Sequence, residues 1–402
     1  MTVPLGRRIA TRAKHRLRSL IWRLPESWRA RLRVMTIVGR LRGLLAGRPA
    51  NAGPVSGEKR AVVYLPTWLQ WDTMRQRPQY LLAAFAAAGH PVYFVDTREP
   101  APRRAAGVQI VPGLEHVPTS GAILYVHFAP IRALFDRFDR PAIVYDLLDD
   151  LSIYDADEIG YPEERRVRAH HPHVMAAADV VIVSNPLLAE RHRAERADLL
   201  LVQNGVDPAI FGTGVARPAD LPDPDPARPT IGYHGAVAHW FDFDLITAVA
   251  RRAPDWRFVL VGPVDERVRR EADLLAALPN VELMGERPSD AMPGYVQGFD
   301  VGAIWFQITE MTQGVTPLKM YEYLAAGVPC VSTPLPACVE EPAVATAADP
   351  DTFVARLREA LAASGDLESM VERRKAAEAH SWQARLEPAL ERLRALGLER
   401  VP

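Results

Sequence analysis

The sequence has little cysteine, little lysine and no long apolar run. Only 2 of its 402 residues are Cys, too few for a disulfide framework or a cysteine-rich zinc site. No window approaches the roughly 18 consecutive apolar residues of a membrane-spanning helix. The Arg-rich opening also lacks the apolar centre of a secretory signal. These absences argue against membrane-spanning and disulfide-rich classes, and we expect a protein of the reducing cytosol.

Charge is distributed unevenly, although the formal net charge is −1. Residues 1–60 hold 15 Lys and Arg against 2 Asp and Glu, a balance of +13, and the rest of the chain carries −14. Leu17, Trp22, Trp28 and further apolar residues interleave with the arginines, as in amphipathic helices that lie on a membrane. We expect residues 1–60 to bind an anionic membrane surface, with a solvated extension that has no partner as the alternative. No nucleic-acid partner is expected, because two tryptophans are too few to stack bases.

Short apolar runs alternate with helical patterns through the rest of the chain. Runs without polar alternation are typical of parallel strands that helices cover on both faces. Strands are expected at residues 61–65, 92–95, 108–111, 122–127, 142–145, 180–183 and 199–202, and in a second series at 230–233, 257–261, 281–284, 301–305 and 328–332. The sequence therefore predicts an α/β protein with two doubly wound, Rossmann-like domains facing each other across a cleft.

Five prolines among residues 213–229 separate the two series and predict an extended, stiff connector rather than a core element. The expected parts are a basic amphipathic extension (1–60), an N-terminal domain (61–212), the Pro-rich linker (213–229), a C-terminal domain (230–385) and a final helix (386–402). Because ligands of such sheets bind at the carboxyl ends of the strands, the cleft between the two domains is the expected site.

The stretch QGVTPLKMYEYLAAGVPCVSTP, residues 313–334, predicts a helix with defined ends. Thr316 is suited to cap the helix, Pro317 to occupy its first position, and Gly327 to end it. Lys319 then lies in the first turn, where the helix dipole disfavours a cation by about 0.3–1 kcal/mol. A lysine there is explained if an anion such as phosphate docks at the helix N-terminus.

Glu322 follows Lys319 by one turn on the same face, where its carboxylate is suited to the hydroxyl pair of a ribose. The alternative is a surface ion pair between the two side chains, worth a few tenths of a kcal/mol. Lysine is rare in this chain, at four positions, while arginine is used elsewhere. This rarity favours a specific role for Lys319.

The same stretch resembles the donor-binding helix of GT-B glycosyltransferases, particularly the GT4-like bacterial enzymes that build cell-surface polysaccharides. Colinear segments that carry the resemblance are LVQNGVD (201–207), IGYHGAVAHWFDFDLI (231–246), FVLVGP (258–263) and PNVELMGERPSDAMPGYVQGFDVGAIWF (279–306). The segments YLPTWLQWDTMRQRPQYL (64–81) and YDLLDDLSIYD (145–155) resemble the teichuronic-acid-type, TuaH-like subgroup. The resemblance implies the GT-B fold, a nucleotide-sugar donor on the C-terminal domain, an acceptor on the N-terminal domain, and a last helix that crosses back.

The resemblance also assigns donor-binding roles. Lys319 and the backbone near Thr316 would hold the diphosphate, Glu322 the ribose, and residues 284–286 would frame the nucleobase. The implied donor set is Gly235, His234, Met284, Gly285, Glu286, Thr316, Pro317, Lys319 and Glu322.

The chain departs from the retaining pattern of this family at two places. The pattern has a glutamate eight residues before the ribose carboxylate, where this chain has Gly314. It also has Arg and Lys after the first glycine turn of the C-terminal domain; both are missing here, and His234, His239 and Trp240 lie nearby instead. Inversion and retention of the sugar therefore both stay open.

An inverting transfer needs a general base to deprotonate the acceptor hydroxyl. The catalytic candidates are Asp72, Asp149, Asp150 and His127. Asp149 and Asp150 are adjacent, and their repulsion would raise one pKa towards the working range of a base. His127 closes a strand at the place where related enzymes put a donor-facing histidine. The alternatives are a helix cap, a solvated carboxylate and a strand-end histidine bonded to backbone.

Arg75 and Arg77 flank the start of the first expected helix, and they are candidates to meet an anionic acceptor or the diphosphate. Surface roles are the alternative for both. A bound metal is not expected from the sequence. The Asp-Phe-Asp at 242–244 resembles a metal-binding motif but falls at a helix start, where Asp caps. His170, His171 and His173 lack an evident fourth ligand. We predict no obligatory metal and no other cofactor.

The expected function is that of a hexosyl-type glycosyltransferase. It would move a sugar from a nucleotide-diphosphate donor, UDP-sugar by default, to a hydroxyl of a glycan or lipid-linked acceptor in cell-surface polysaccharide or glycolipid synthesis. The protein is expected in the cytoplasm, peripheral on the inner face of the membrane. Two alternatives stay open: a nucleotide-sugar epimerase or hydrolase on the same fold, and a non-catalytic membrane-associated scaffold, to which Gly314 gives weight.

Overall fold

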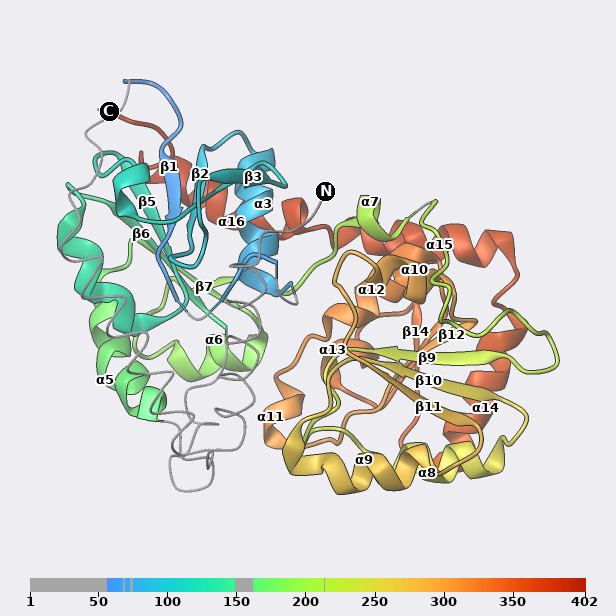
Figure 1. Cartoon of the computed structure of the whole chain (residues 1–402). Helices are drawn as coiled ribbons and strands as arrows, with labels where there is room; N and C mark the ends of the chain where they lie inside the picture. The colour runs from blue at the N-terminus through green and yellow to red at the C-terminus, as the bar shows by residue number, and fades with distance from the viewer. Residues whose placement is uncertain (1–55, 68, 73–74, 149–161, 213) are drawn as a thin grey trace, which may run out of the picture.

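The computed structural model describes residues 56–402 except 68, 73–74, 149–161 and 213 (Figure 1). Most of the basic extension and both Asp149 and Asp150 lie outside the described residues. Two α/β domains lie side by side, one drawn in blue to green and the other in yellow to red (Figure 1). The predicted fold class is confirmed. In the described part of the chain, no helix is long and apolar enough to cross a bilayer.

The N-terminal domain contains an eight-stranded sheet with the order β3-β4-β2-β1-β5-β6-β7-β8. Its strands are β1 (Ala61–Tyr64), β2 (Val92–Val95), β3 (Arg103–Ala105), β4 (Val108–Val111), β5 (Ala122–Val126), β6 (Ala142–Leu147), β7 (Val180–Val183) and β8 (Leu200–Leu201). All neighbours run parallel except β3 and β4. The seven apolar runs correspond to seven strands. Edge strand β3 was not predicted, because its Arg-Arg-Ala sequence has no apolar run.

Helices cover both faces of this sheet. They are α3 (Arg77–Ala87), α5 (Pro162–Ala177) and α6 (Pro186–His192), with 3-10 segments η1 (Leu114–His116) and η2 (Ala129–Arg137). The short α7 (Pro208–Phe211) packs instead on the C-terminal domain, where Phe211 joins the apolar core. One apolar cluster joins the sheet to α3, and a second joins its other face to η2, α5 and α6. Helix α3 begins at Arg77, as predicted, after Gln76, whose backbone N–H donates to Gln79 Oε1 at 3.0 Å.

The C-terminal domain contains a six-stranded parallel sheet with the order β11-β10-β9-β12-β13-β14. Its strands are β9 (Thr230–His234), β10 (Arg257–Val261), β11 (Val281–Gly285), β12 (Val301–Ile304), β13 (Cys330–Ser332) and β14 (Val344–Thr346). Its helices are α8 (Phe243–Arg252), α9 (Arg269–Ala276), α10 (Met292–Gln297), α11 (Glu310–Gln313), α12 (Leu318–Ala326), α13 (Pro336–Val339), α14 (Pro350–Ala362) and α15 (Leu367–Ala379), with the 3-10 turn η3 (Glu266–Val268). The five expected strands are present, and only the short edge strand β14 was missed.

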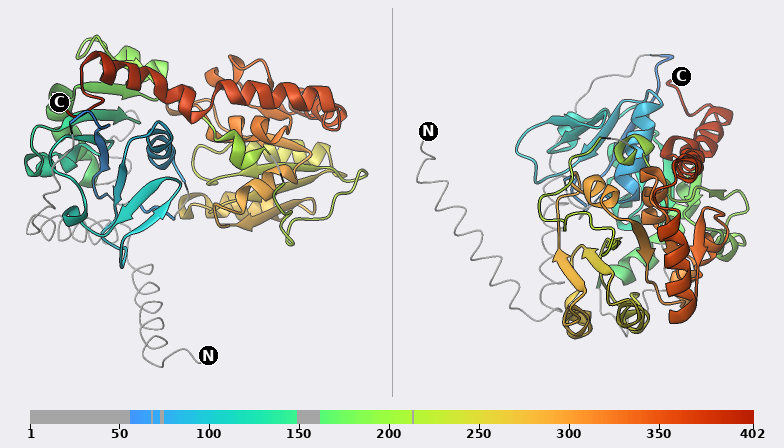
Figure 2. Two further views of the ribbon diagram at one scale, coloured as in Figure 1. Left: turned by 90° about the horizontal axis from the view of Figure 1, so that it is seen from above. Right: turned by 90° about the vertical axis from the view of Figure 1, so that its right-hand side faces the viewer.

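The chain passes between the domains twice, and the two passages lie together. Val206 pairs with Ser381 in a parallel bridge, and the Val206 N–H donates to His380 O at 3.0 Å. The last helix, α16 (Trp382–Ala395), then packs against α3 of the N-terminal domain (Figure 2). Trp382 stacks on Tyr80 with 5.2 Å between ring centroids. The helix that returns to the first domain therefore starts at residue 382, four residues before the expected boundary.

The Pro-rich linker is extended, but it is not separate from the core. Leu221 is only 3% exposed and belongs to the apolar cluster of the C-terminal domain. Next to it, Asp220 accepts a 2.6 Å hydrogen bond from the Tyr295 hydroxyl and pairs with Arg287 at 2.9 Å. No helix or strand lies in the described part of residues 213–229, as predicted, although Leu221 packs into the core. The Leu221 N–H donates to Pro218 O at 3.2 Å, so the linker turns where this side chain meets the C-terminal domain.

Candidate functional site in the interdomain cleft

A large cavity lies between the two domains, at the carboxyl ends of the strands where the fold class predicts a ligand. Its volume is about 1240 Å³, more than the roughly 300–1,000 Å³ of an ordinary small-molecule site. The N-terminal domain contributes the starts of α3 and α6 to its wall. The C-terminal domain contributes the loops after β9 to β12 and the start of α12. The cavity therefore has room for two substrates together.

Helix α12 points its N-terminus into this cavity. Pro317 is its N-cap, with a ψ of 122°, and the helix begins at Leu318 rather than at the proline. Thr316 is thus not the cap, and this prediction is wrong by one residue because Pro317 keeps an extended conformation. Gly327 ends the helix with a φ of 80°, as predicted. Lys319 remains in the first turn, where the earliest N–H groups of a helix have no partner within it.

The Lys319 ammonium lies between two aromatic rings. Its Nζ is 4.7 Å from the ring centroid of Phe306 and 5.1 Å from that of Tyr233, both cation–π distances. Among the described residues, no carboxylate forms an ion pair with it. Burial lowers the pKa of Lys319 to about 8, although the charge of Glu322 acts in the opposite direction. The site therefore holds a desolvated cation that an incoming anion would stabilise.

Glu322 does not pair with Lys319, so the alternative of a surface ion pair is wrong. Its Oε2 lies 3.1 Å from Nε2 of His234, and both residues are buried in the cavity wall. The His234 backbone N–H donates to the hydroxyl of Tyr323 at 3.3 Å. The end of β9 and the second turn of α12 are thereby joined, and the Glu322 carboxylate is held in one orientation.

Two glycines bring backbone close to Lys319. Gly235 and Gly262 follow β9 and β10 with φ values of 119° and 154°. A Cβ on Gly262 would lie 2.1 Å from Gly235 O, and a Cβ on Gly235 would lie 3.2 Å from Lys319 Cε. Side chains at these positions would force the two loops apart, so the close approach requires glycine. Gly235 therefore lies where the resemblance places phosphate-facing backbone.

Only one of the three residues expected to frame a nucleobase lines the cavity. Glu286 lines the cavity, whereas Met284 and Gly285 are not among its lining residues. Met284 is buried in the core of the C-terminal domain. Successive strand residues point to opposite faces, so Met284 faces the core of the domain. The residues that follow Glu286, from Arg287 to Ser289, and Met292 line the cavity in their place.

Arg77 lines the cavity but is already paired. It is 3% exposed, and its Nε lies 2.9 and 3.0 Å from the carboxylate oxygens of Asp146, which also accepts a hydrogen bond from the Tyr125 hydroxyl. Its Nη1 lies 3.4 Å from Asn204 Oδ1, and Asn204 Nδ2 donates to Thr316 O at 2.8 Å. Arg77 therefore connects the core of the N-terminal domain to the residue just before Pro317. Its Nη2 has no hydrogen-bond partner among the described residues.

Of the four catalytic candidates, the structure describes Asp72 and His127. Asp72 is on the cavity rim with its side chain 74% exposed, and it pairs with Arg103 at 2.6 Å. His127 is not among the lining residues, and it stacks on Tyr64 with its Nδ1 3.2 Å from the tyrosine hydroxyl. Burial lowers the pKa of His127 to about 4, so its imidazole is a weak base. Arg75 is half-buried in the cavity wall, as expected. The roles of Asp149 and Asp150 stay predictions.

Several lining residues were not found from the sequence. Trp240, Phe306 and Arg267 line the cavity from the C-terminal domain. From α6, Arg191 reaches across to α11, and its Nη2 lies 2.5 Å from Glu310. These residues lie in loops at strand ends and at a helix end, where no periodic pattern marks them.

Neither of the two metal-like patterns of the sequence forms a metal site by itself. Asp242 caps α8, where its carboxylate accepts a 2.9 Å hydrogen bond from the Leu245 N–H, as the alternative reading proposed. His170, His171 and His173 do not converge. His170 Nδ1 accepts a hydrogen bond from Arg132, and His173 is exposed. His171 instead lies beside residues much later in the sequence, outside the cavity lining.

Comparisons with known proteins agree with this geometry. Residues 228–363 match the family described as Glycosyl transferases group 1. Over 194 residues the chain is 30% identical to TuaH of Bacillus subtilis (strain 168), whose name assigns it to glycosyl transfer in teichuronic acid biosynthesis. The match covers 47% of this chain and 49% of TuaH, so the chain spans about half the length of the curated relative that it matches.

Solved structures share the fold at low identity. Sucrose-phosphate synthase from Thermosynechococcus elongatus has a TM-score of 0.61 and 14% identity, over 84% of this chain and 99% of that one. HepE of Anabaena, in complex with UDP and glucose, has a TM-score of 0.55 and 14% identity, over 84% and 100%. The trehalose-6-phosphate synthase OtsA has a TM-score of 0.61 and 13% identity, over 84% and 99%. The resemblance to GT-B glycosyltransferases is confirmed, and the fold is GT-B.

Proposed function

We propose that this chain, whose C-terminal domain matches the group 1 glycosyltransferases, transfers a hexose from a nucleoside-diphosphate donor to an acceptor hydroxyl. The observation that carries the proposal is the Lys319 ammonium. It lies in the first turn of a helix that faces the interdomain cavity, and no described carboxylate neutralises it. A lysine so placed is matched by a diphosphate, because helix N–H groups and ammonium both attract an anion.

The chemistry follows from where charge develops during the reaction. As the bond between the sugar and the β-phosphate breaks, negative charge grows on the departing nucleoside diphosphate. Lys319 and the first N–H groups of α12 stabilise this growing charge more strongly than the smaller charge of the intact donor. The difference lowers the barrier. Gly235 and Gly262 allow backbone to lie against the phosphates, and Glu322, oriented by His234, accepts hydrogen bonds from the ribose hydroxyls.

UDP is the nucleotide that we propose, and a cell-surface glycan or lipid-linked sugar is the acceptor. HepE, which shares the fold, was solved in complex with UDP and glucose, and the name of TuaH refers to teichuronic acid biosynthesis. The volume of the cavity supports simultaneous binding of donor and acceptor. An acceptor would enter along the wall formed by the starts of α3 and α6, where Arg75 lines the cavity.

We further propose that Asp149 or Asp150 is the general base that accepts the proton of the acceptor hydroxyl. Asp72 pairs with Arg103, and His127 lies off the cavity, which leaves these two of the four candidates. Asparagine at the catalytic position should lower kcat by about 10²–10⁴-fold. UDP binding should be unchanged, because the base contacts the acceptor. Unchanged kcat in both single variants would contradict the assignment.

The transfer is proposed to need no obligatory metal. Lys319 supplies the positive charge at the diphosphate, and Asp242 is used as a helix cap. Turnover should therefore be unchanged, within about a factor of two, after treatment with a chelator. A large loss that added Mg²⁺ or Mn²⁺ restores would contradict this part of the proposal.

Residues 1–60 are proposed to hold the protein on the inner face of the cytoplasmic membrane. Their balance of +13 supports attraction to anionic lipids, worth about 1 kcal/mol for each cation near the surface. The full chain should sediment with vesicles that contain phosphatidylglycerol and not with pure phosphatidylcholine vesicles. A chain lacking residues 1–55 is the comparison. Equal sedimentation of both chains would show that the extension does not hold the protein on the membrane.

The donor site is tested by calorimetric and thermal-shift titrations with UDP, GDP and UDP-sugars. A ligand at a hundredfold excess over its Kd stabilises the folded protein by about 2.7 kcal/mol. The wild type should show this shift with UDP, Lys319→Ala should lose it, and Lys375→Ala, at an exposed position on α15, should keep it. No binding of any nucleotide to the wild type would favour a scaffold. Release of free sugar without acceptor would favour a hydrolase.

A further inference from the structure

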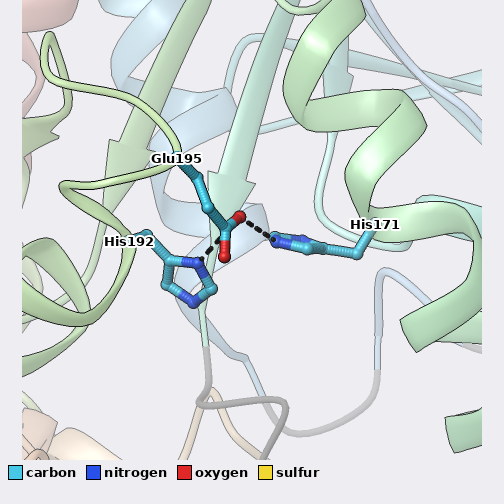
Figure 3. Close-up of side chains that lie close together, drawn as sticks. All are labelled: His171, His192 and Glu195. Atoms are coloured by element: carbon cyan, nitrogen blue, oxygen red, sulfur yellow. Dashed lines mark ion pairs between the residues drawn. The ribbon is translucent and has the colours of Figure 1, made fainter.

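Two histidines and a glutamate converge on the N-terminal domain, outside the cavity lining (Figure 3). His171 comes from α5, His192 is the last residue of α6, and Glu195 lies in the turn that follows. Glu195 Oε2 is 3.5 Å from His171 Nε2 and 3.3 Å from His192 Nδ1. The three atoms all lie within 4.8 Å of one another. Figure 3 shows both rings directed at the one carboxylate.

Both ring nitrogens that face the carboxylate lie at ion-pair distance from it, but neither has a hydrogen-bond partner among the described residues. His171 is 6% exposed, and its Nε2 and the Nδ1 of His192 are both buried without a hydrogen-bond partner. Each unsatisfied buried polar atom costs about 1–3 kcal/mol. A single cation between the three atoms would satisfy both nitrogens and the carboxylate together.

Two of the three distances between ligand atoms match a tetrahedral metal site. Zinc binds imidazole nitrogen and carboxylate oxygen at about 2.0–2.2 Å, which places neighbouring ligand atoms about 3.3–3.5 Å apart at tetrahedral angles. The two distances to Glu195 Oε2, 3.3 and 3.5 Å, fall at this separation. Two imidazoles and one carboxylate also form a ligand set that zinc commonly takes in proteins, with the fourth position left to water.

A further residue holds His171 in position. Its Nδ1 lies 2.9 Å from the hydroxyl of Tyr145, on the neighbouring strand β6. Metal-binding histidines almost always have their second nitrogen hydrogen-bonded in this way, which fixes the ring and its tautomer. The side chain of Glu195 is 51% exposed, so an ion can enter from solvent.

We propose that His171, His192 and Glu195 bind one zinc-like divalent metal ion, which fastens α5 to α6. The ion would not take part in glycosyl transfer, because none of its ligands lines the cavity. The ion would instead hold α6 in place. This helix contributes Leu188 and Arg191 to the cavity wall, and Arg191 pairs there with Glu310 of the opposite domain. Fixing the end of α6 fixes this part of the wall.

The test is binding of Zn²⁺ and Co²⁺ to the full chain after removal of metal by a chelator. Calorimetry should show one saturable Zn²⁺ site, and Co²⁺ should give the intense visible absorption of a tetrahedral complex. His192→Ala and Glu195→Gln should each weaken binding more than about a hundredfold, the upper end of the loss expected for an outer partner. Tyr145→Phe should weaken it by about 10–100-fold.

His173→Ala is the matched control, because His173 is an exposed histidine on the same helix. It should bind Zn²⁺ as tightly as the wild type. Glu195→Gln alters an exposed side chain and is expected to fold, which circular dichroism verifies. Binding with equal affinity in the wild type, His192→Ala and Glu195→Gln would overturn the proposal, as would the absence of saturable binding in the wild type. In that case the three side chains form only the close contact of Glu195 with the two histidines.

Discussion

Donor affinity should depend on the ionisation of Lys319. Burial lowers the pKa of this lysine to about 8, so near neutral pH it is mostly charged, and above pH 8 it is mostly neutral. The diphosphate of a UDP-sugar attracts the charged form, and binding should therefore raise the pKa of Lys319. Above pH 8 the lysine must take up a proton when donor binds, and the observed affinity should fall as pH rises.

The size of the effect follows from the pKa. With a pKa of about 8 in the free protein, the charged fraction of Lys319 falls from about nine tenths at pH 7.0 to about one quarter at pH 8.5, which weakens binding about fourfold. About three quarters of a proton should be taken up per donor bound at pH 8.5. The other groups that influence this lysine are Glu322, Cys330 and Cys338. Burial raises the pKa of both thiols, which keeps them neutral over this range.

The assay is isothermal titration with a UDP-sugar at pH 7.0 and 8.5, in buffers that differ in ionisation enthalpy so that proton uptake is measured. A UDP-sugar is preferred to UDP because its diphosphate has no phosphate proton that titrates near neutral pH. Lys319→Arg keeps its charge throughout and should bind with an affinity that does not change between the two values of pH. Wild-type affinity that is independent of pH, or an equal loss in Lys319→Arg, would refute the assignment of the diphosphate to this lysine.

Three further substitutions test other parts of the structure. Arg77→Ala should lower the free energy of unfolding, measured with urea, by about 3–5 kcal/mol, because it leaves Asp146 buried and unpaired; a role in acceptor binding alone would leave stability unchanged. Trp382→Ala should lower the free energy of unfolding by about 3–5 kcal/mol, because it removes the buried ring that packs α16 against the N-terminal domain. An unchanged urea midpoint would contradict this. Gly262→Ala should weaken UDP binding in calorimetry, because its Cβ would meet Gly235 O and introduce about 1–3 kcal/mol of strain; wild-type affinity would show that the loops can separate.

Much of the fold could be predicted because parallel strands buried on both faces are continuous apolar runs. Twelve such runs were expected, and each corresponds to a strand. The two missed strands, β3 and β14, are short edge strands. Their neighbours lie on one side only, so their sequences carry less of the apolar signal. The helix that contains Lys319 was also predictable, because Pro317 and Gly327 mark its ends within a few residues.

The partners of the charged side chains could not be predicted in the same way. Arg77 was expected to meet an anionic substrate, but it pairs with Asp146, 69 residues later in the chain. The pairing requires β6 to lie near the start of α3, which depends on the order of strands in the sheet. Glu322 similarly meets His234 rather than Lys319, since the start of α12 packs against the end of β9.

The sequence by itself therefore determined the elements, the two-domain organisation and the lysine at the start of α12, because each depends on residues within a few turns of one another. The tertiary structure alone decided which cations remain available to a ligand and which side chains meet. Within the part of the chain that the structure describes, Lys319 has no carboxylate partner, and His171 lies beside His192 and Glu195. Contacts between distant segments are fixed by strand order and helix packing, and no local pattern of residues encodes them.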